Sequence, residues 1–413
     1  MKAIHYMDHA AATPLRPEVR EAMEPYLGER FWNPSAVYDL GSRAREAVEE
    51  AREQVARLIN AEAEEIVFTS SGAEANNLAV KGIPFAHPKR GKRIIVSSVE
   101  HHSVLNSARF FERLGYEVTF LPVDGHGLVD PERLERSIDD QTVLVSVMLA
   151  NNEIGTIEPV KELCQVAHRH GAFFHTDGVA AVGNIPVDVK ELGVDLLSLS
   201  GIGVGGPKGS GALYFKKGTR LMPLIHGGIQ ERGRRAGTED VPGIVGLGRA
   251  AELRREELPE RMEYLRRLRE RLVEGLMERV PRLRYTGHPT RRLPGHASFC
   301  VEGVEGEALV FLLSARGIYA NTGSACASKA LKVSPVLKAI GLPDVVAQGS
   351  VVFTLDRTNT PEEIELVIEE FPKAASRLRA MSPVWNEAQG GGDEADHQDP
   401  VWDQAVGRAC QAV

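Results

Sequence analysis

Apolar positions along the first 250 residues follow two different periods. Between residues 42 and 59 they recur with helical spacing and alternate with charges, which predicts an amphipathic helix. Further on, short β-prone runs are separated by helical segments; these runs cover residues 65–70, 93–98, 118–123, 142–149, 172–177, 195–200 and 212–215. Strands that are apolar on both faces and separated by helices are typical of a parallel sheet covered on both sides. We therefore predict an α/β fold with a mostly parallel seven-stranded sheet.

The pattern changes near residue 250, where a long charged helix begins that only Pro259 interrupts. We expect a large domain over residues 1–250 and a smaller α+β domain over residues 251–381. The N-terminal arm of residues 1–20 is expected to pack with the smaller domain. Residues 382–413 include the polar, glycine-rich stretch GGGDEADHQD, which predicts a disordered tail. The tail repeats Pro-Val-Trp at residues 383–385 and 400–402, either as a docking peptide or without function.

Composition narrows the choice of partners. The 413 residues include 49 Lys and Arg against 57 Asp and Glu, a net charge of −8, which argues against nucleic acid or an anionic membrane as the main partner. No apolar run is long enough to span a bilayer, and the first residues lack the core of a secretory signal. A cytoplasmic location is therefore predicted.

The four cysteines form no CxxC pair, so neither a disulfide framework nor a zinc site is expected. Cys164 and Cys300 lie in apolar surroundings, which predicts buried and inert thiols. Cys326 follows small polar residues, and a nearby lysine, Lys329, would favour its thiolate. It is the candidate for a reactive thiol.

Polar residues follow four of the predicted strands, at the edge where ligands bind in open α/β sheets. Gly72 and Ala73 open a helix, which suits either a phosphate site or an ordinary helix cap. His101 could be a metal ligand, a base or a ring that stacks on a cofactor. Asn152 ends another strand, and the carboxylate of Asp177 requires a cationic partner or several hydrogen-bond donors.

The segment at residues 201–206 has the spacing GxGxxG. A dinucleotide-binding fingerprint requires a helix after these glycines, whereas here Pro207 leads towards the next strand. A dinucleotide site is therefore not expected.

Taken in chain order, these segments resemble the cysteine desulfurase family, fold-type I enzymes that use pyridoxal phosphate (PLP) to remove sulfur from cysteine. The similarity extends from Tyr6 to about Met381. It rests on Tyr6-Met7-Asp8-His9-Ala10-Ala11, Asn33-Pro34-Ser35, Glu100-His101, Asn151-Asn152-Glu153-Ile154-Gly155, His175-Thr176-Asp177, Gly205-Gly206-Pro207-Lys208-Gly209, Glu231-Arg232-Gly233, Gly237-Thr238-Glu239 and Gly323-Ser324-Ala325-Cys326.

The resemblance implies a role for each retained residue. His101 would stack on the PLP ring, Asp177 would pair with the pyridinium nitrogen, and Asn152 would contact the ring hydroxyl. Ser200, together with Thr238 from a neighbouring subunit, would hold the phosphate. The chain would then be a homodimer.

The resemblance also implies that Cys326 attacks the substrate sulfur and carries it as a persulfide. An acceptor protein, such as an iron–sulfur scaffold, would then receive the sulfur. No metal site is expected.

This chain departs from the family pattern at several positions. Family members have Ser-Gly-His-Lys after the strand at residues 195–200, and that lysine forms the Schiff base with PLP, whereas here Gly203 stands in its place. Glycine can neither bind the cofactor covalently nor move a proton between substrate and cofactor. Other polar residues of the family are replaced here by Ala73, Ala180, Ile202 and Val352, the last in place of the arginine expected to hold the substrate carboxylate.

Three hypotheses follow. We expect a noncatalytic homologue or sulfur-handling partner protein that binds PLP weakly or not at all. The alternative is an active PLP-dependent cysteine desulfurase that moves sulfur through Cys326 to iron–sulfur cluster or thio-cofactor assembly. A third hypothesis is a thiol protein whose Cys326 takes part in an iron–sulfur site without PLP.

Overall fold

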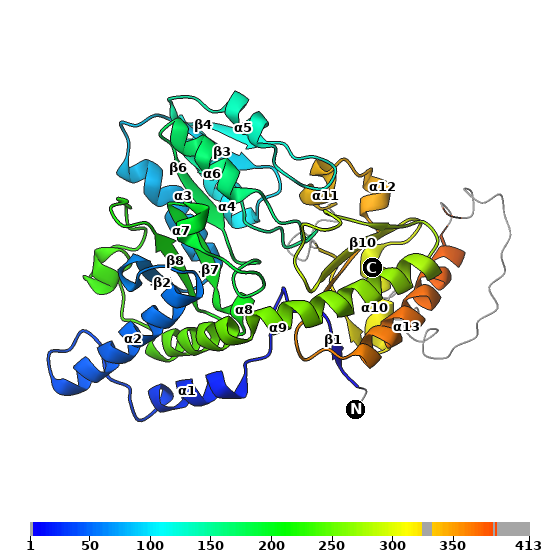
Figure 1. The fold of residues 1–413 in the computed structure, drawn as a ribbon, viewed down its shortest axis with the longest axis horizontal. Coiled ribbons are helices and arrows are strands. Elements are labelled where there is room, and N and C mark those ends of the chain that lie inside the picture. Colours follow the sequence, from blue (N-terminus) through cyan, green and yellow to red (C-terminus); the bar gives the residue numbers. More distant parts are fainter. Residues whose placement is uncertain (1–2, 324–332, 383–384, 386–413) are drawn as a thin grey trace.

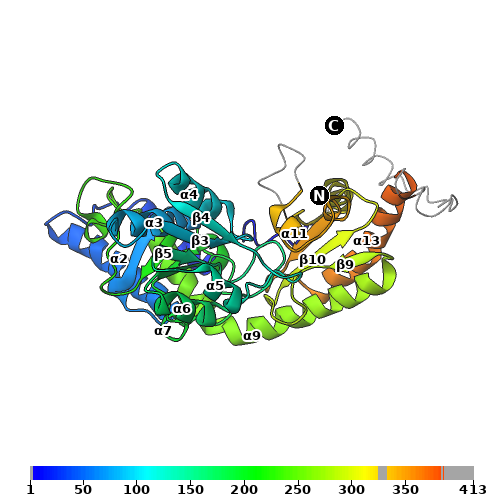
Figure 2. The same ribbon diagram turned by 90° about the horizontal axis from the view of Figure 1, so that it is seen from above.

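The chain folds into two lobes joined by one long helix, α9 (Val241–Arg279) (Figures 1 and 2). The structure, a computed structural model, describes residues 3–323, 333–382 and 385. Helix α9 packs against α1 (Pro17–Leu27) and α2 (Asp39–Leu58) in the first lobe and against α13 (Pro361–Ala380) in the second.

The first lobe is built on a seven-stranded sheet. Its strands are β2 (Ile66–Thr69), β3 (Arg93–Ser97), β4 (Glu117–Leu121), β5 (Thr142–Ser146), β6 (Phe173–Asp177), β7 (Leu196–Ser200) and β8 (Gly211–Phe215). They are ordered β2-β8-β7-β6-β5-β3-β4, and only β8 runs antiparallel to its neighbours. The prediction of a mostly parallel seven-stranded α/β sheet is confirmed.

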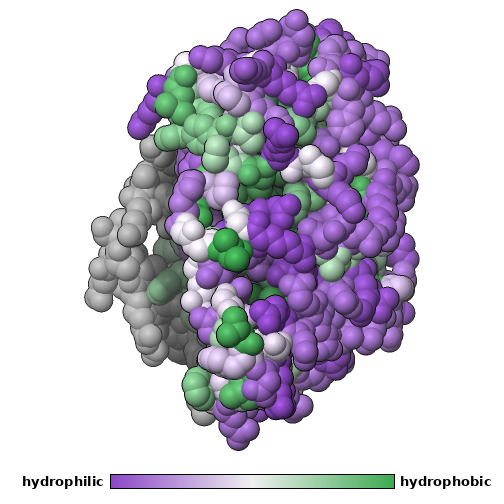
Figure 3. All heavy atoms as spheres, turned by 90° about the vertical axis from the view of Figure 1, so that its left-hand side faces the viewer, coloured by the Kyte–Doolittle hydropathy of each residue, from purple (hydrophilic) through white to green (hydrophobic). Residues whose placement is uncertain are grey.

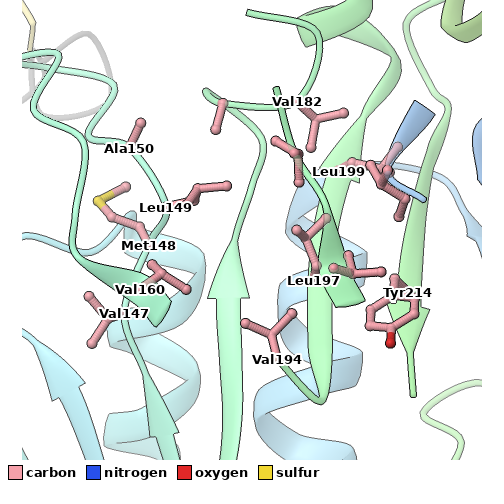
Figure 4. Packing of buried hydrophobic residues seen from close by; sticks show 14 of the residues in the cluster. Val147, Met148, Leu149, Ala150, Val160, Val182, Val194, Leu197, Leu199 and Tyr214 are labelled. Atoms are coloured by element: carbon pink, nitrogen blue, oxygen red, sulfur yellow. The ribbon is translucent and has the colours of Figure 1, made fainter. Parts of the chain in front are cut away.

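Helices cover both faces of this sheet. The helices of the first lobe that follow α2 are α3 (Gly72–Ala86), α4 (His102–Glu112), α5 (Pro131–Ser137), α6 (Val160–Arg169), α7 (Val189–Leu192) and α8 (Gly201–Val204). Apolar side chains of α3 and α4 fill one face, while α2, α5, α6, α7 and α9 cover the other. Figure 4 shows part of the apolar cluster on the face that α2 and α9 cover, where Leu197 and Leu199 of β7 lie near Tyr214 of β8.

Helix α9 begins earlier than the sequence pattern indicates and is not interrupted by Pro259. Asp240 caps its first turn by accepting a hydrogen bond from the Gly243 backbone N–H at 3.2 Å. The first turns of α9 contain several glycines, which disfavour a helix in an isolated segment. In the folded chain these glycines allow α9 to pack closely against its neighbouring helices. A Cβ atom on Gly248 would lie 2.6 Å from Cα of Ala51 in α2.

The second lobe contains a three-stranded antiparallel sheet of β9 (Leu283–Tyr285), β10 (His296–Val301) and β12 (Ser350–Thr354). Its helices are α10 (Gly306–Ala315), α11 (Pro335–Ala339), α12 (Asp344–Ala347) and α13. The N-terminal arm reaches this lobe, because β1 (His5–Tyr6) pairs with β11 (Ile318–Tyr319) and Asp8 bridges to Thr354. The domain boundaries drawn from the sequence stay predictions, and most of the tail lies outside the described residues.

Within the described ranges, no helix has both the length and the apolar character needed to cross a membrane.

Candidate functional site

Asp177 ends β6 at the carboxyl edge of the large sheet and is almost fully buried. Its Oδ1 accepts a hydrogen bond from the Val179 backbone N–H at 3.0 Å, and its Oδ2 accepts one from Asn76 Nδ2 at 2.6 Å. Burial raises the pKa of Asp177, while the nearby His101 and these two donors lower it. Donors rather than a paired cation therefore satisfy this carboxylate, and it can receive a cationic ligand.

His101 is the N-cap of α4 and lies in the same region as Asp177. Its Nδ1 contacts Ser103 Oγ at 2.7 Å, and Ser103 also accepts a hydrogen bond from Asn76 Nδ2 at 2.9 Å. The link from His101 through Ser103 and Asn76 to Asp177 holds the ring and the carboxylate in one network. His102 points differently, since the two imidazole rings lie 6.2 Å apart at 59°.

The candidate phosphate residues also come together. Ser200 ends β7, and a Cβ atom on Gly72 at the start of α3 would lie only 3.4 Å from Cβ of Ser200. Ser71 caps α3 by accepting a hydrogen bond from the Glu74 backbone N–H at 3.1 Å, while Ala73 is exposed. A helix start therefore lies beside Ser200, as a phosphate site requires.

Gly203 lies on α8, a four-residue helix that follows β7 directly. It lines a cavity of about 660 Å³, mouth included, together with Asn152, Ala180 and Ile202. No lysine lines this cavity in the part of the chain that the structure describes. A Cβ atom on Gly203 would lie 2.6 Å from the Val179 carbonyl oxygen, so any larger residue requires a shift of that segment. The assignment of Gly203 to the Schiff-base position stays a prediction.

Cys326 lies outside the described residues, but the segment that contains it begins and ends beside the site. Ser334, after the segment, donates a hydrogen bond from Oγ to Glu153 Oε2 at 2.5 Å. Gly323, before it, lies so close that a Cβ atom there would be 3.7 Å from the same oxygen. Burial raises the pKa of Glu153, the neighbour of Asn152, to about 7.

Thr238 is exposed on the segment that leads into α9. Arg235 anchors this segment to α3 through a 3.0 Å ion pair with Glu74. The role expected for Thr238 across a subunit interface stays a prediction.

Sequence reasoning missed a buried charged cluster at the boundary of the two lobes. Asp356, just after β12, contacts Arg254 at 3.2 Å and Arg261 at 3.1 Å, and both arginines lie on α9. Asp356 and Arg261 line the cavity of Gly203, as does His9 of the N-terminal arm. The sequence carries no local signal for this cluster, because Asp356 and Arg261 are 95 positions apart.

Comparisons with known proteins agree with this architecture. Residues 5–367 match the family model for aminotransferase class-V. The chain is 51% identical over 379 residues to a cysteine desulfurase IscS of Methanosarcina thermophila, covering 92% of this chain and 94% of that protein. A cysteine desulfurase IscS of Clostridium botulinum is 49% identical over 384 residues, with 92% and 97% covered.

Solved structures give the same result. A NifS-like protein superposes with a TM-score of 0.85 at 36% identity, covering 91% of this chain and all of that one. The NifS-like protein of Rickettsia africae gives a TM-score of 0.82 at 30% identity, with 90% and 99% covered. The fold is therefore that of fold-type I PLP enzymes, and PLP is the cofactor expected for the family. By sequence and by structure, the chain belongs to the cysteine desulfurase family of class V aminotransferases.

Proposed function

We propose that the chain is a PLP-dependent cysteine desulfurase that transfers sulfur from cysteine through Cys326 to an acceptor protein. The observation that carries this proposal is the network joining Asp177 to His101 at the carboxyl edge of the sheet. The identity of about half to proteins named cysteine desulfurase supports this active alternative better than the noncatalytic hypothesis.

The residues present fit the PLP ring. Asp177 is a buried carboxylate with hydrogen-bond donors but no bonded cation, so a pyridinium N–H would supply the missing positive charge. His101 would cover the ring, Asn152 would contact its hydroxyl, and Ser200 beside Gly72 would hold the phosphate. When bound, PLP withdraws electrons from the bonds around the cysteine α-carbon.

The transfer step uses this chain's own thiol. The Cys326 thiolate attacks the sulfur of cysteine, an S–S bond forms and the C–S bond breaks. The electron pair of the broken bond stays with carbon, which takes a proton, so that cysteine leaves as alanine. The flanks of the Cys326 segment meet Glu153 beside Asn152, which supports delivery of the thiol to this site.

Sulfide release from L-cysteine, measured with added PLP and dithiothreitol, tests the proposal. We expect release that disappears in Cys326→Ser, because only a thiol can carry the sulfur as a persulfide. Cys410→Ser is the matched control and should retain the wild-type rate. Release that is unchanged in Cys326→Ser would contradict the role of this thiol.

A second candidate function has a specific observation in its favour. Gly203 supplies no amine, so the chain would be a noncatalytic sulfur-handling homologue that binds PLP weakly. This function predicts no sulfide release from cysteine, but transfer of sulfur from a persulfide donor to Cys326. Mass spectrometry after exposure to such a donor separates it from the first candidate.

We also propose that the chain is a homodimer. Large apolar side chains are exposed around the α1–α2 connection and before η2 (Gln230–Gly233), including Phe31 (79% exposed), Val37 (97%) and Ile229 (89%). The face at the left of Figure 1 carries apolar patches among polar ones (Figure 3). Analytical ultracentrifugation at micromolar concentration should show a dimer. A result of monomer alone would contradict this proposal and also the role of Thr238 in holding the phosphate of a neighbouring subunit.

A further inference from the structure

A tryptophan of the C-terminal tail contacts the second lobe. Trp385 follows shortly after the end of α13, and its indole ring lies on the turn after β10. A Cβ atom on Gly303 of this turn would lie only 2.4 Å from Cε3 of the ring, so the indole lies directly against the glycine. Gly303 also has a φ of +81°, which favours glycine over any residue with a side chain. The turn therefore leaves room for an aromatic ring.

Two arginines hold this ring. The guanidinium carbon of Arg379, in the last turn of α13, lies 4.0 Å from the centre of the indole, and that of the exposed Arg282 lies 5.2 Å from it. Arg379 is 5% exposed and is fixed by hydrogen bonds to the carbonyl oxygens of Glu302 at 3.0 Å and Pro281 at 2.8 Å. A cation near a tryptophan ring attracts it, and the attraction is stronger where water is excluded. We call Gly303 and these two arginines the tryptophan clasp.

The sequence contains a second copy of the segment around Trp385. Residues 383–388 are PVWNEA and residues 400–405 are PVWDQA, so four of six positions are identical and the other two exchange an amide for an acid or the reverse. Residues 400–405 lie outside the described residues. The ring that fits the clasp is therefore present twice in the tail, each time in nearly the same local sequence.

The tail is long enough for either copy to reach the clasp. The composition of residues 386–399 predicts a disordered, glycine-rich chain. The ends of such a chain of about 20 residues lie about 22–27 Å apart on average, and this tether holds a ligand near its site at a millimolar effective concentration. Closing the longer loop costs more entropy, which favours Trp385 over Trp402 by about 10- to 20-fold.

We propose that the tryptophan clasp is a docking site for the Pro-Val-Trp segments of this chain, with Trp385 as its occupant and Trp402 as the alternative one. Because one glycine and one pair of arginines form the clasp, only one ring occupies it at a time. When Trp402 replaces Trp385, the tail is held 17 positions further along the chain, and a shorter end remains free. This inference does not depend on the proposed function.

Fluorine NMR of the full chain labelled with 5-fluorotryptophan tests the proposal, because the chain has only three tryptophans. In Trp385→Ala we expect the Trp402 resonance to move towards the position that Trp385 had, with a ratio of docked to free ring about 10- to 20-fold lower. Trp402→Ala is the matched control and should leave the Trp385 resonance in place. A Trp402 resonance that is the same in the wild type and in Trp385→Ala would overturn the proposal. So would a shift that appears only at high protein concentration, because it would indicate docking between chains.

Arg282→Gln and Arg284→Gln test the clasp itself. Arg282 is exposed, so its replacement should not affect folding, and it should lower the ratio of docked to free Trp385 about 2- to 5-fold. Arg284 lies two positions further along the chain and pairs with Glu302 at 3.0 Å, so Arg284→Gln should leave the Trp385 resonance unchanged. Equal effects of the two substitutions would show that the surface charge, and not the contact with the ring, holds Trp385.

Discussion

Replacing Asp356 with asparagine is expected to lower the free energy of unfolding by about 3–5 kcal/mol. Asp356 is the shared partner of Arg254 and Arg261, whose side chains are 2% and 3% exposed. Asparagine keeps the shape but removes the charge, so the buried Arg261 would lose its charged partner, and Arg254 would keep only its 3.3 Å ion pair with Glu257. Urea unfolding followed by circular dichroism measures the loss.

Asp344→Asn is the control for this prediction. Its ion pair with Lys338 lies on the surface, where both side chains are at least half exposed, and such pairs contribute about 0–1 kcal/mol. A loss from Asp356→Asn as small as that from Asp344→Asn would show that the buried cluster adds little to stability.

The same substitution should alter the dependence of stability on pH. Burial alone would raise the pKa of Asp356, but the charges of Arg261 and Arg254 outweigh it and hold the pKa well below its usual value. A carboxyl whose pKa is lowered by folding stabilises the protein above its unfolded pKa, near 3.9, and loses that contribution as the pH falls. The wild type should therefore lose stability between about pH 5 and pH 2 more steeply than Asp356→Asn.

Gly203→Lys is expected to raise the rate of sulfide release by about 10²- to 10⁴-fold, the usual contribution of a positioned acid–base group. The lysine amine would anchor PLP covalently and move protons at the substrate α-carbon. The protein with PLP should also acquire a visible absorbance band that borohydride fixes to the chain. Stopped assays and spectra of the same preparation measure both effects.

Gly203→Ala is the control that separates the effect of the lysine amine from the effect of adding a side chain at this position. Both variants place a Cβ atom where the Val179 carbonyl oxygen is only 2.6 Å away, and such crowding costs about 1–3 kcal/mol of stability. Alanine should show this loss in thermal unfolding without any gain in rate. If lysine gives neither absorbance nor a faster rate than alanine, position 203 does not face the cofactor site.

Much of the large sheet could be predicted because its strands are continuous apolar runs between amphipathic helices. β5 and β7 are buried at every position and β6 at every position but Phe173, as expected for parallel strands covered on both sides. The start of α9 could not be predicted, because Gly243, Gly246 and Gly248 disfavour a helix locally. Close packing against α1 and α2 favours the helix at this place.

The sequence by itself determined the family, the sheet and the strand-end positions of Asp177 and Ser200, because these depend on short segments and their order along the chain. Only the tertiary structure decided what those residues contact. Asn76, which donates a hydrogen bond to Asp177, lies 101 positions from it in the sequence, and Asp356 lies 95 positions from Arg261. Residues so far apart in sequence carry no local pattern. Asn76 and Asp177 meet because α3 packs on β6, and Asp356 meets Arg261 because α9 extends from the first lobe to the second.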